Sequence, residues 1–157
     1  LGNKINGDYD KVLKKDEPIW VIVTLKGALH FAADLTRLIK HPTYIDFVRL
    51  ASYGSGTETS GQVRFLKDIE KSPEGAHLLV LDEIVDSGNT LAFLGERLQS
   101  QNPKSLKFAT LLSKPSRRKV QVAVDYIGLE VEDKFLVGYG LDFAEKYRHL
   151  KDIYVVG

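Results

Sequence analysis

The chain alternates short apolar runs with longer stretches in which apolar residues recur at helical spacing. Residues 19–25, 77–81 and 106–112 are apolar on both faces of an extended chain, which is typical of strands covered on both sides in a parallel sheet. Residues 28–40 instead carry an apolar stripe at helical spacing, and so does the stretch that begins at Leu91. The stripe residues are Phe31, Leu35, Leu38 and Ile39 in the first helix and Leu91, Leu94 and Leu98 in the second.

The remaining segments are shorter or more polar. Residues 44–50 predict a further strand, with Ile45 and Phe47 on one side of it. Residues 51–62 are small and polar and include three glycines, a composition typical of a mobile loop. Residues 1–18 are polar and rich in lysine, aspartate and glycine, and Pro18 ends them. Three short β candidates occupy the last third of the chain, at residues 124–131, 135–139 and 153–156.

Strands and helices interleave over the first two thirds of the chain, and no repeat or linker interrupts them. This order predicts an α/β fold with a mostly parallel central sheet flanked by helices, formed as one domain over residues 1–157. In such sheets ligands bind beyond the carboxyl ends of the strands. The turns after Leu25, Leu81 and Leu112 are therefore the places to look for chemistry.

Composition narrows the classes of function. With 22 basic and 21 acidic side chains the net charge is +1, which excludes a broad cationic surface for nucleic acid. The absence of cysteine excludes a disulfide framework, a thiolate nucleophile and a cysteine zinc site. No apolar run approaches the ~20 residues of a membrane helix, so we expect no membrane partner and a cytoplasmic location. Because methionine is absent too, we expect further residues to precede Leu1.

The most informative stretch follows the apolar run at residues 77–81. Asp82 and Glu83 come directly after that run, and Asp86 precedes the sequence Ser-Gly-Asn-Thr at the start of a predicted helix. Free backbone N–H groups at a helix N-terminus, together with nearby hydroxyls, are suited to bind a phosphate. Carboxylates repel phosphate, so their expected partners are sugar hydroxyls, magnesium or a proton. The alternative for this turn is ordinary helix capping by Asp86 or Ser87.

This stretch resembles the signature of the type I phosphoribosyltransferases, an apolar strand followed by two acidic residues, two apolar residues, Asp and Thr/Ser-Gly-x-Thr. Further blocks in family order are similar to the hypoxanthine-guanine branch, and together they span nearly all of residues 20–157. The blocks similar to that branch are Thr24 to Gly27, Ser52 to Gly54, Leu111 to Arg118, Val137 to Asp142 and Tyr147 to Leu150. The fold that the resemblance implies is the type I phosphoribosyltransferase fold, with a small β-rich hood formed by the terminal segments.

The resemblance implies a purine salvage enzyme that joins hypoxanthine or guanine to phosphoribosyl pyrophosphate, giving IMP or GMP and pyrophosphate. Asp82 and Glu83 would hold the ribose hydroxyls, and Asp86 would accept or stabilise the proton at N7 of the purine. The 5′-phosphate would bind at Ser87, Gly88, Asn89 and Thr90. The family usually has Asp at the second acidic position, so Glu83 is a departure that could shift the hydroxyl contact.

The purine would bind against residues from three parts of the sequence. By resemblance Lys114 donates to the 6-oxo group, Phe135 stacks on the ring and the backbone of Leu136 reads the base edge. Taken alone, a lysine such as Lys114 is more often a solvated turn residue, and Phe135 could equally be a core residue. The preference among hypoxanthine, guanine and xanthine depends on the placement of Phe135, Leu136 and Asp133, which the sequence leaves open.

The resemblance also implies a pyrophosphate site and a magnesium ion. Lys26 and Gly27 lie in a turn where the family often has a cis peptide that presents N–H groups to pyrophosphate, and Arg148 would contact the same group. Ala28 replaces a glycine that is common there. Ser52 and Tyr53 would reach pyrophosphate from a loop, residues 51–61, that closes over the site. Magnesium would be held by Asp142, with Asp82 and Glu83.

Two other classes of function are compatible with parts of the pattern. A regulatory module that binds RNA would need a basic, aromatic-interleaved face, which the sequence lacks. A phosphate-accepting receiver domain also places paired acidic residues at a strand end, but it does not account for the blocks around Lys114, Phe135 and Asp142. The run Arg117 to Lys119 is expected to be a solvated basic turn without a catalytic role. The resemblance favours a homodimer or a homotetramer.

Overall fold

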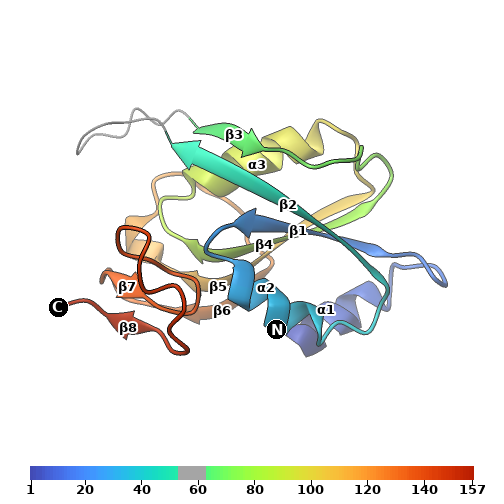
Figure 1. The fold of residues 1–157 in the computed structure, drawn as a ribbon. Helices are drawn as coiled ribbons and strands as arrows, with labels where there is room; N and C mark the ends of the chain where they lie inside the picture. Colours follow the sequence, from blue (N-terminus) through green and yellow to red (C-terminus); the bar gives the residue numbers. More distant parts are fainter. Residues whose placement is uncertain (53–62) are drawn as a thin grey trace.

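The described residues, 1–52 and 63–157 of this computed structural model, form one large sheet with helices on both faces and a small second sheet (Figure 1). The large sheet has the strand order β3-β2-β1-β4-β5-β6, and all of its neighbouring strands are parallel except β2 and β3. This confirms the predicted α/β fold with a mostly parallel sheet. The strands are β1 (Ile19–Leu25), β2 (Thr43–Ser52), β3 (Val63–Lys67), β4 (His77–Val85), β5 (Ser105–Ser113) and β6 (Tyr126–Glu130).

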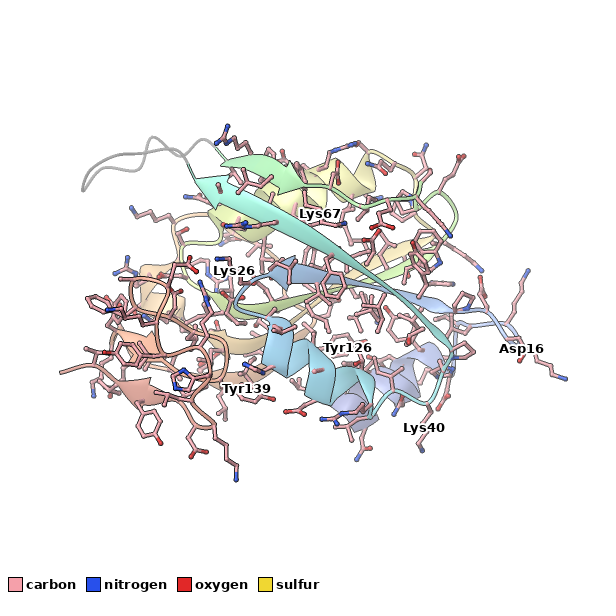
Figure 2. The ribbon with its side chains drawn as sticks, viewed as in Figure 1. Asp16, Lys26, Lys40, Lys67, Tyr126 and Tyr139 are labelled. Carbon is pink, nitrogen blue, oxygen red and sulfur yellow. The ribbon has the colours of Figure 1, made fainter. Side chains whose placement is uncertain are left out.

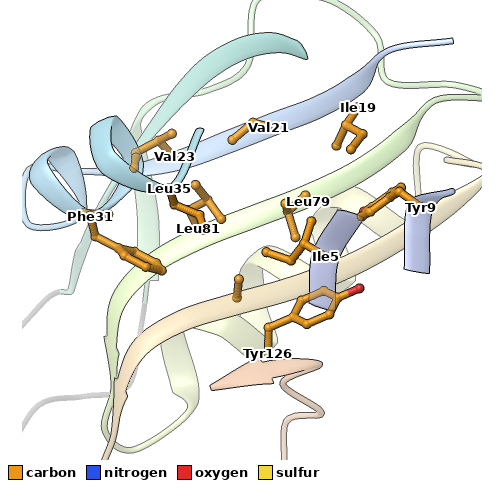
Figure 3. Packing of buried hydrophobic residues seen from close by; sticks show 13 residues of the cluster. Ile5, Tyr9, Ile19, Val21, Val23, Phe31, Leu35, Leu79, Leu81 and Tyr126 are labelled. Carbon is orange, nitrogen blue, oxygen red and sulfur yellow. The ribbon is translucent and has the colours of Figure 1, made fainter. Parts of the chain in front are cut away.

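Two helices cover one face of the sheet. Helices α1 (Gly2–Tyr9) and α2 (Leu29–Thr36) pack on β1 and β4 through a buried apolar cluster (Figure 3). Ile5 and Tyr9 come from α1, four residues apart and so on one side of the helix. The polar composition of residues 1–18 gave no indication of this helix. The helix predicted at residues 28–40 is longer than the one observed, because α2 ends at Thr36 and Leu38 lies exposed beyond it.

Helix α3 (Asn89–Gln99) covers the opposite face. Its three predicted stripe residues, Leu91, Leu94 and Leu98, are all buried, and they pack with apolar side chains of β1, β2 and β4. The cores on the two faces are separate clusters divided by the sheet. Strands β1 and β4 therefore have both faces covered, which is why residues 19–23 and 78–81 are apolar at every position.

The second sheet pairs β7 (Leu136–Val137) with β8 (Tyr154–Val155) in antiparallel fashion, and we call residues 135–157 the hood. The hood lies beyond the carboxyl end of β1 (Figure 1). Tyr139 fixes it to the main body, because its hydroxyl donates to the Asp34 carboxylate on α2. Its strands are shorter than the predicted segments 135–139 and 153–156. Within the described residues, no helix has the length and apolar character required to cross a membrane.

Candidate functional site

The candidate site lies where the strand order of the large sheet reverses. The chain leaves β1 toward β2 on one side, whereas β4 continues the sheet on the other, and such a switch point opens a crevice at the carboxyl ends of the strands. A cavity of about 220 Å³ occupies this place. It is lined by the ends of β1 and β4 and by the turn that enters α3. A second cavity of about 520 Å³ adjoins it and shares Glu83, Ile84 and Asp86 with it.

The two acidic residues belong to the end of β4 itself, because that strand continues to Val85 rather than ending at Leu81 as predicted. Asp82 is buried, and its Oδ1 accepts hydrogen bonds from Thr24 Oγ1 at 2.5 Å and from the Glu83 backbone N–H at 3.0 Å. Burial raises the pKa of the Asp82 carboxyl. Burial and the adjacent Asp82 carboxylate together raise the pKa of Glu83 well above its usual range. A bound cation or hydroxyl donors would favour the ionised pair.

Two glycines make room for the Glu83 side chain and for the turn after β1. A Cβ atom at Gly27 would lie 2.1 Å from Glu83 Oε1, so the carboxylate occupies the space of a side chain there. The backbone of Gly27 is held in turn by the hood, because a Cβ at Gly140 would lie 1.9 Å from the Gly27 carbonyl oxygen. The Leu25–Lys26 peptide in this turn is cis, as the family resemblance suggested. Glu83, Gly27 and Gly140 thus form one contact chain from β4 to the hood.

The predicted phosphate-binding turn leads directly into α3. Gly88 is the residue before the helix, has φ +90°, and makes no side-chain cap. Of the two capping candidates, Ser87 accepts the N–H of Asn89, the first residue of α3, through its Oγ at 3.3 Å, whereas Asp86 Oδ1 accepts from Arg117 instead. Ser87, Gly88 and Thr90 line the smaller cavity, so the N-terminal end of α3, which carries the positive end of the helix dipole, lies at this cavity.

The segment after β5 supports the turn that precedes α3. Sequence reasoning did not predict these supporting contacts. The backbone N–H groups of Lys119 and Val120 both donate to the Ser87 carbonyl, at 2.9 and 3.1 Å. Arg118 packs its Cδ against Gly88 and donates to Ser113 Oγ at 3.0 Å. The run Arg117 to Lys119 is thus more than a solvated turn, because it contacts and supports the turn that precedes α3.

Arg117 connects two carboxylates at the rim of the larger cavity. Its Nε donates to Asp86 Oδ1 at 2.7 Å, and its Nη1 lies 3.3 Å from Asp133 Oδ2. Arg117 is half exposed, so both contacts lie at the protein surface. This ion pair places Asp86 at the boundary between the two cavities. The sequence offered no sign of it because 31 residues separate the partners.

The larger cavity brings together the three residues predicted to bind a purine. Lys114 is buried, which contradicts the alternative of a solvated turn residue, and its Nζ donates to the Lys134 carbonyl at 2.7 Å. Phe135 is 51% exposed, which contradicts the alternative of a core residue, and it meets Phe143 edge to face. Leu136, at the start of β7, lines the same cavity. The lining of this cavity therefore includes a buried cation and an exposed aromatic ring.

The family model for the phosphoribosyl transferase domain matches residues 4–144. The chain belongs to the phosphoribosyltransferase family. The hypoxanthine-guanine phosphoribosyltransferase of Bacillus subtilis is 44% identical over 156 residues, which cover 99% of this chain and 84% of that relative. A solved hypoxanthine-guanine phosphoribosyltransferase from Bacillus anthracis has a TM-score of 0.90 at 47% identity, covering 99% of this chain and 89% of its own. The hypoxanthine phosphoribosyl transferase of Trypanosoma cruzi gives 0.92 at 38% identity, covering 99% and 83%.

Among the residues that the phosphoribosyltransferase resemblance assigned to pyrophosphate, Lys26 and Gly27 contact the hood, and Arg148 belongs to it. Lys26 extends from the end of β1 toward the hood (Figure 2). Arg148 donates to the Gly140 carbonyl at 2.8 Å and pairs with Asp142 at 2.9 Å. Asp142 itself lines the larger cavity with Glu83. Ser52 is the last residue of β2, while Tyr53 and most of the expected loop, residues 51–61, fall outside the described residues.

The magnesium ligands assigned by the phosphoribosyltransferase resemblance do not form a closed cage. Within the described residues, no three His, Cys, Asp or Glu side chains are grouped so that they could hold a metal alone. Magnesium usually keeps several waters and is bound through one or two carboxylates plus substrate phosphates. Asp82, Glu83 and Asp142 offer carboxylate oxygens at the two cavities, which suits such an ion.

Proposed function

We propose that the protein transfers the 5-phosphoribosyl group from phosphoribosyl pyrophosphate to hypoxanthine or guanine, giving IMP or GMP and pyrophosphate. The observation that carries this proposal is the pair of adjoining cavities. One combines a carboxylate pair with a turn at a helix N-terminus, and the other combines a buried lysine with an exposed aromatic ring. Because they share Glu83 and Asp86, a sugar in the first and a base in the second would meet at those residues.

In the proposed reaction, a purine ring nitrogen forms a bond to the anomeric carbon and the bond from that carbon to pyrophosphate breaks. Asp82 and Glu83 orient the ribose through its hydroxyls, and the turn from Ser87 to Thr90 holds the 5′-phosphate. Asp86 lies at the boundary between the cavities, where a carboxylate can take or stabilise the proton at N7. A positive charge that develops on the sugar is favoured by nearby carboxylates.

Selection of the base follows from hydrogen bonding in the larger cavity. An ammonium has only donors, so Lys114 can bind a 6-oxo group but meets the amino group of adenine donor to donor. A site built for one hydrogen-bonding pattern rejects the opposite pattern strongly, because buried polar groups are left unpaired. Phe135 would stack on the ring and Leu136 would read its edge. The proposed substrates are therefore 6-oxopurines.

Pyrophosphate and magnesium complete the proposal. Lys26, Gly27 and Arg148, with Ser52 and Tyr53, are proposed to bind pyrophosphate. Magnesium, held by Asp142 with Asp82 and Glu83, would neutralise charge on the leaving group when bound. The position of Asp82, Glu83 and Asp142 at the two adjoining cavities supports this assignment, because magnesium is usually bound through one or two carboxylates plus substrate phosphates.

We further propose that the protein is a cytoplasmic homodimer or homotetramer without a nucleic-acid or membrane partner. A multiply charged sugar phosphate does not cross a bilayer unaided, which supports a compartment where that substrate is made. In the Trypanosoma cruzi relative, the C-terminal region has a role in the oligomeric state and enzymatic activity. Light scattering coupled to size-exclusion chromatography tests the assembly, and a monomer at all concentrations would contradict it.

A base panel tests the proposed activity. The purified protein is given phosphoribosyl pyrophosphate with hypoxanthine, guanine, xanthine or adenine, with magnesium and with a chelator. The proposal predicts nucleotide formation from hypoxanthine, guanine or both, dependence on magnesium, and little turnover of adenine. Absence of turnover with every 6-oxopurine contradicts it. Salt-sensitive RNA binding without turnover would favour a regulatory module instead.

A further inference from the structure

Glu145 joins the two cations proposed to bind pyrophosphate. Its Oε2 lies 2.6 Å from Lys26 Nζ, and its Oε1 lies 3.4 Å from the Arg148 guanidinium. Lys26 follows β1 and Glu145 belongs to the hood, 119 residues later in the chain. One carboxylate of the hood therefore spans both cations, with one oxygen on each.

We propose that Glu145 is an internal counter-anion that takes the place of pyrophosphate oxygens at Lys26 and Arg148 in the free protein and yields to them on binding. The inference rests on the proposed function, because it takes Lys26 and Arg148 as pyrophosphate ligands. Two oxygens of one carboxylate on two cations resemble two oxygens of a pyrophosphate on the same cations. Both anions cannot occupy the same contacts, since like charges at this distance repel.

The surroundings of Glu145 allow it to exchange. Its side chain is 63% exposed and that of Lys26 is 43% exposed, so water can replace either partner. Lys26 holds the pKa of the Glu145 carboxyl below its usual range, which keeps the carboxylate ionised. Asp142, by contrast, is held on two sides by Arg148 and by the Glu145 backbone N–H. The Glu145 side chain can therefore leave while Asp142 keeps its position.

An internal anion of this kind lowers the affinity for pyrophosphate and for the pyrophosphoryl group of the substrate. Binding must break the Lys26–Glu145 contact, and release re-forms it, so the exchange favours product release. Exposed ion pairs are weak, so the expected effect on affinity is about two- to fivefold. Glu145 acts through Lys26 and Arg148 and is a positioning residue.

The test replaces Glu145 with glutamine, which keeps the shape and removes the charge. Calorimetric titration with inorganic pyrophosphate and magnesium is expected to show about two- to fivefold tighter binding to Glu145→Gln than to the wild type. The KM for phosphoribosyl pyrophosphate is expected to fall by a similar factor, with kcat unchanged or lower. Glu74→Gln is the matched control, because it removes an equal charge from an exposed side chain before β4, at the other end of the sheet.

A double-mutant cycle separates this role from general electrostatics. In a Lys26→Met background the gain from Glu145→Gln should largely disappear, because the contact that competes with pyrophosphate is already lost. Equal or weaker pyrophosphate binding by Glu145→Gln overturns the inference, and so does a gain that persists in the Lys26→Met background or appears equally in Glu74→Gln. Glu145→Asp, which retains the charge, should bind pyrophosphate more like the wild type if Glu145→Gln unfolds. A wild type without turnover would contradict the proposed function instead.

Discussion

Replacing Gly140, a residue to which no substrate contact is assigned, with alanine is expected to damage the site. Gly140 lies in the hood turn with φ +102°, and its α-carbon faces the carbonyl oxygen of Gly27. An added Cβ would lie 1.9 Å from that oxygen, whereas ordinary contacts begin at 3.4 Å. The two backbones would therefore have to separate by at least about 1.5 Å, the difference between these two distances.

That separation moves the turn after β1 relative to the carboxylate pair on β4. Gly27 lies directly against the Glu83 carboxylate, so it cannot retreat toward β4 without a second clash. A misplacement of about 1 Å in a binding site can reduce activity about a hundredfold. The left-handed backbone of Gly140 adds a conformational cost of about 1–3 kcal/mol for alanine. We therefore expect kcat/KM for phosphoribosyl pyrophosphate to fall about a hundredfold.

Gly75→Ala separates these two effects. Gly75 also has a left-handed backbone, φ +70°, but its added Cβ would meet nothing within 4 Å. Both variants should lose thermal stability, whereas only Gly140→Ala should lose activity when kcat/KM is measured well below the unfolding temperature. A kcat/KM of Gly140→Ala within about twofold of that of Gly75→Ala would refute the claim that the hood positions the turn after β1, which contains Lys26 and Gly27.

Three further outcomes follow from individual side chains. Asp86→Asn should lower kcat about 10²- to 10⁴-fold with little change in binding of phosphoribosyl pyrophosphate by calorimetry, and unchanged turnover would remove Asp86 from catalysis. Lys114→Ala should reduce kcat/KM for hypoxanthine about tenfold to a hundredfold but not for adenine, and an equal loss for all bases would indicate a folding defect. Burial, together with the nearby Lys104 charge, lowers the pKa of His77 below its usual value of 6.5. Below about pH 6.5 the unfolded chain therefore binds a proton at His77 more readily than the folded chain does, so the free energy of unfolding falls as the pH drops. His77→Gln should reduce this pH dependence of the free energy of unfolding, measured by urea denaturation. A pKa of His77 at or above 6.5, measured by NMR in the folded protein, would contradict this.

The strands of the main sheet were predictable because burial on both faces leaves a continuous apolar sequence, as in the first five residues of β1 and in residues 78–81 of β4. Helix α1 was missed because only Ile5 and Tyr9 mark its apolar side, within an otherwise polar segment. Strand β3 was missed because it is short, alternates half-buried with exposed residues, and follows a glycine-rich stretch of sequence. The length of α2 was overestimated because Leu38 continues the apolar spacing in sequence but lies exposed after the helix.

The site was predictable where its residues are contiguous in sequence. Asp82 through Thr90 form one stretch, and a strand that leads into a helix places them at one cavity. The contacts of Arg117 and Glu145 were not predictable, because each connects distant segments and depends on how the hood and the β5–β6 connection pack. The roles of the purine and pyrophosphate residues stay predictions until substrates are tested.

The central claim is that one protein uses these two cavities to exchange pyrophosphate for a purine. It is tested most directly by quantifying IMP and pyrophosphate in the same quenched sample after hypoxanthine, phosphoribosyl pyrophosphate and magnesium are mixed with the purified protein. The proposed mechanism predicts that both products appear together in a one-to-one ratio and that neither forms when hypoxanthine is omitted. Pyrophosphate release that is independent of the base, or no IMP at any protein concentration, would contradict it.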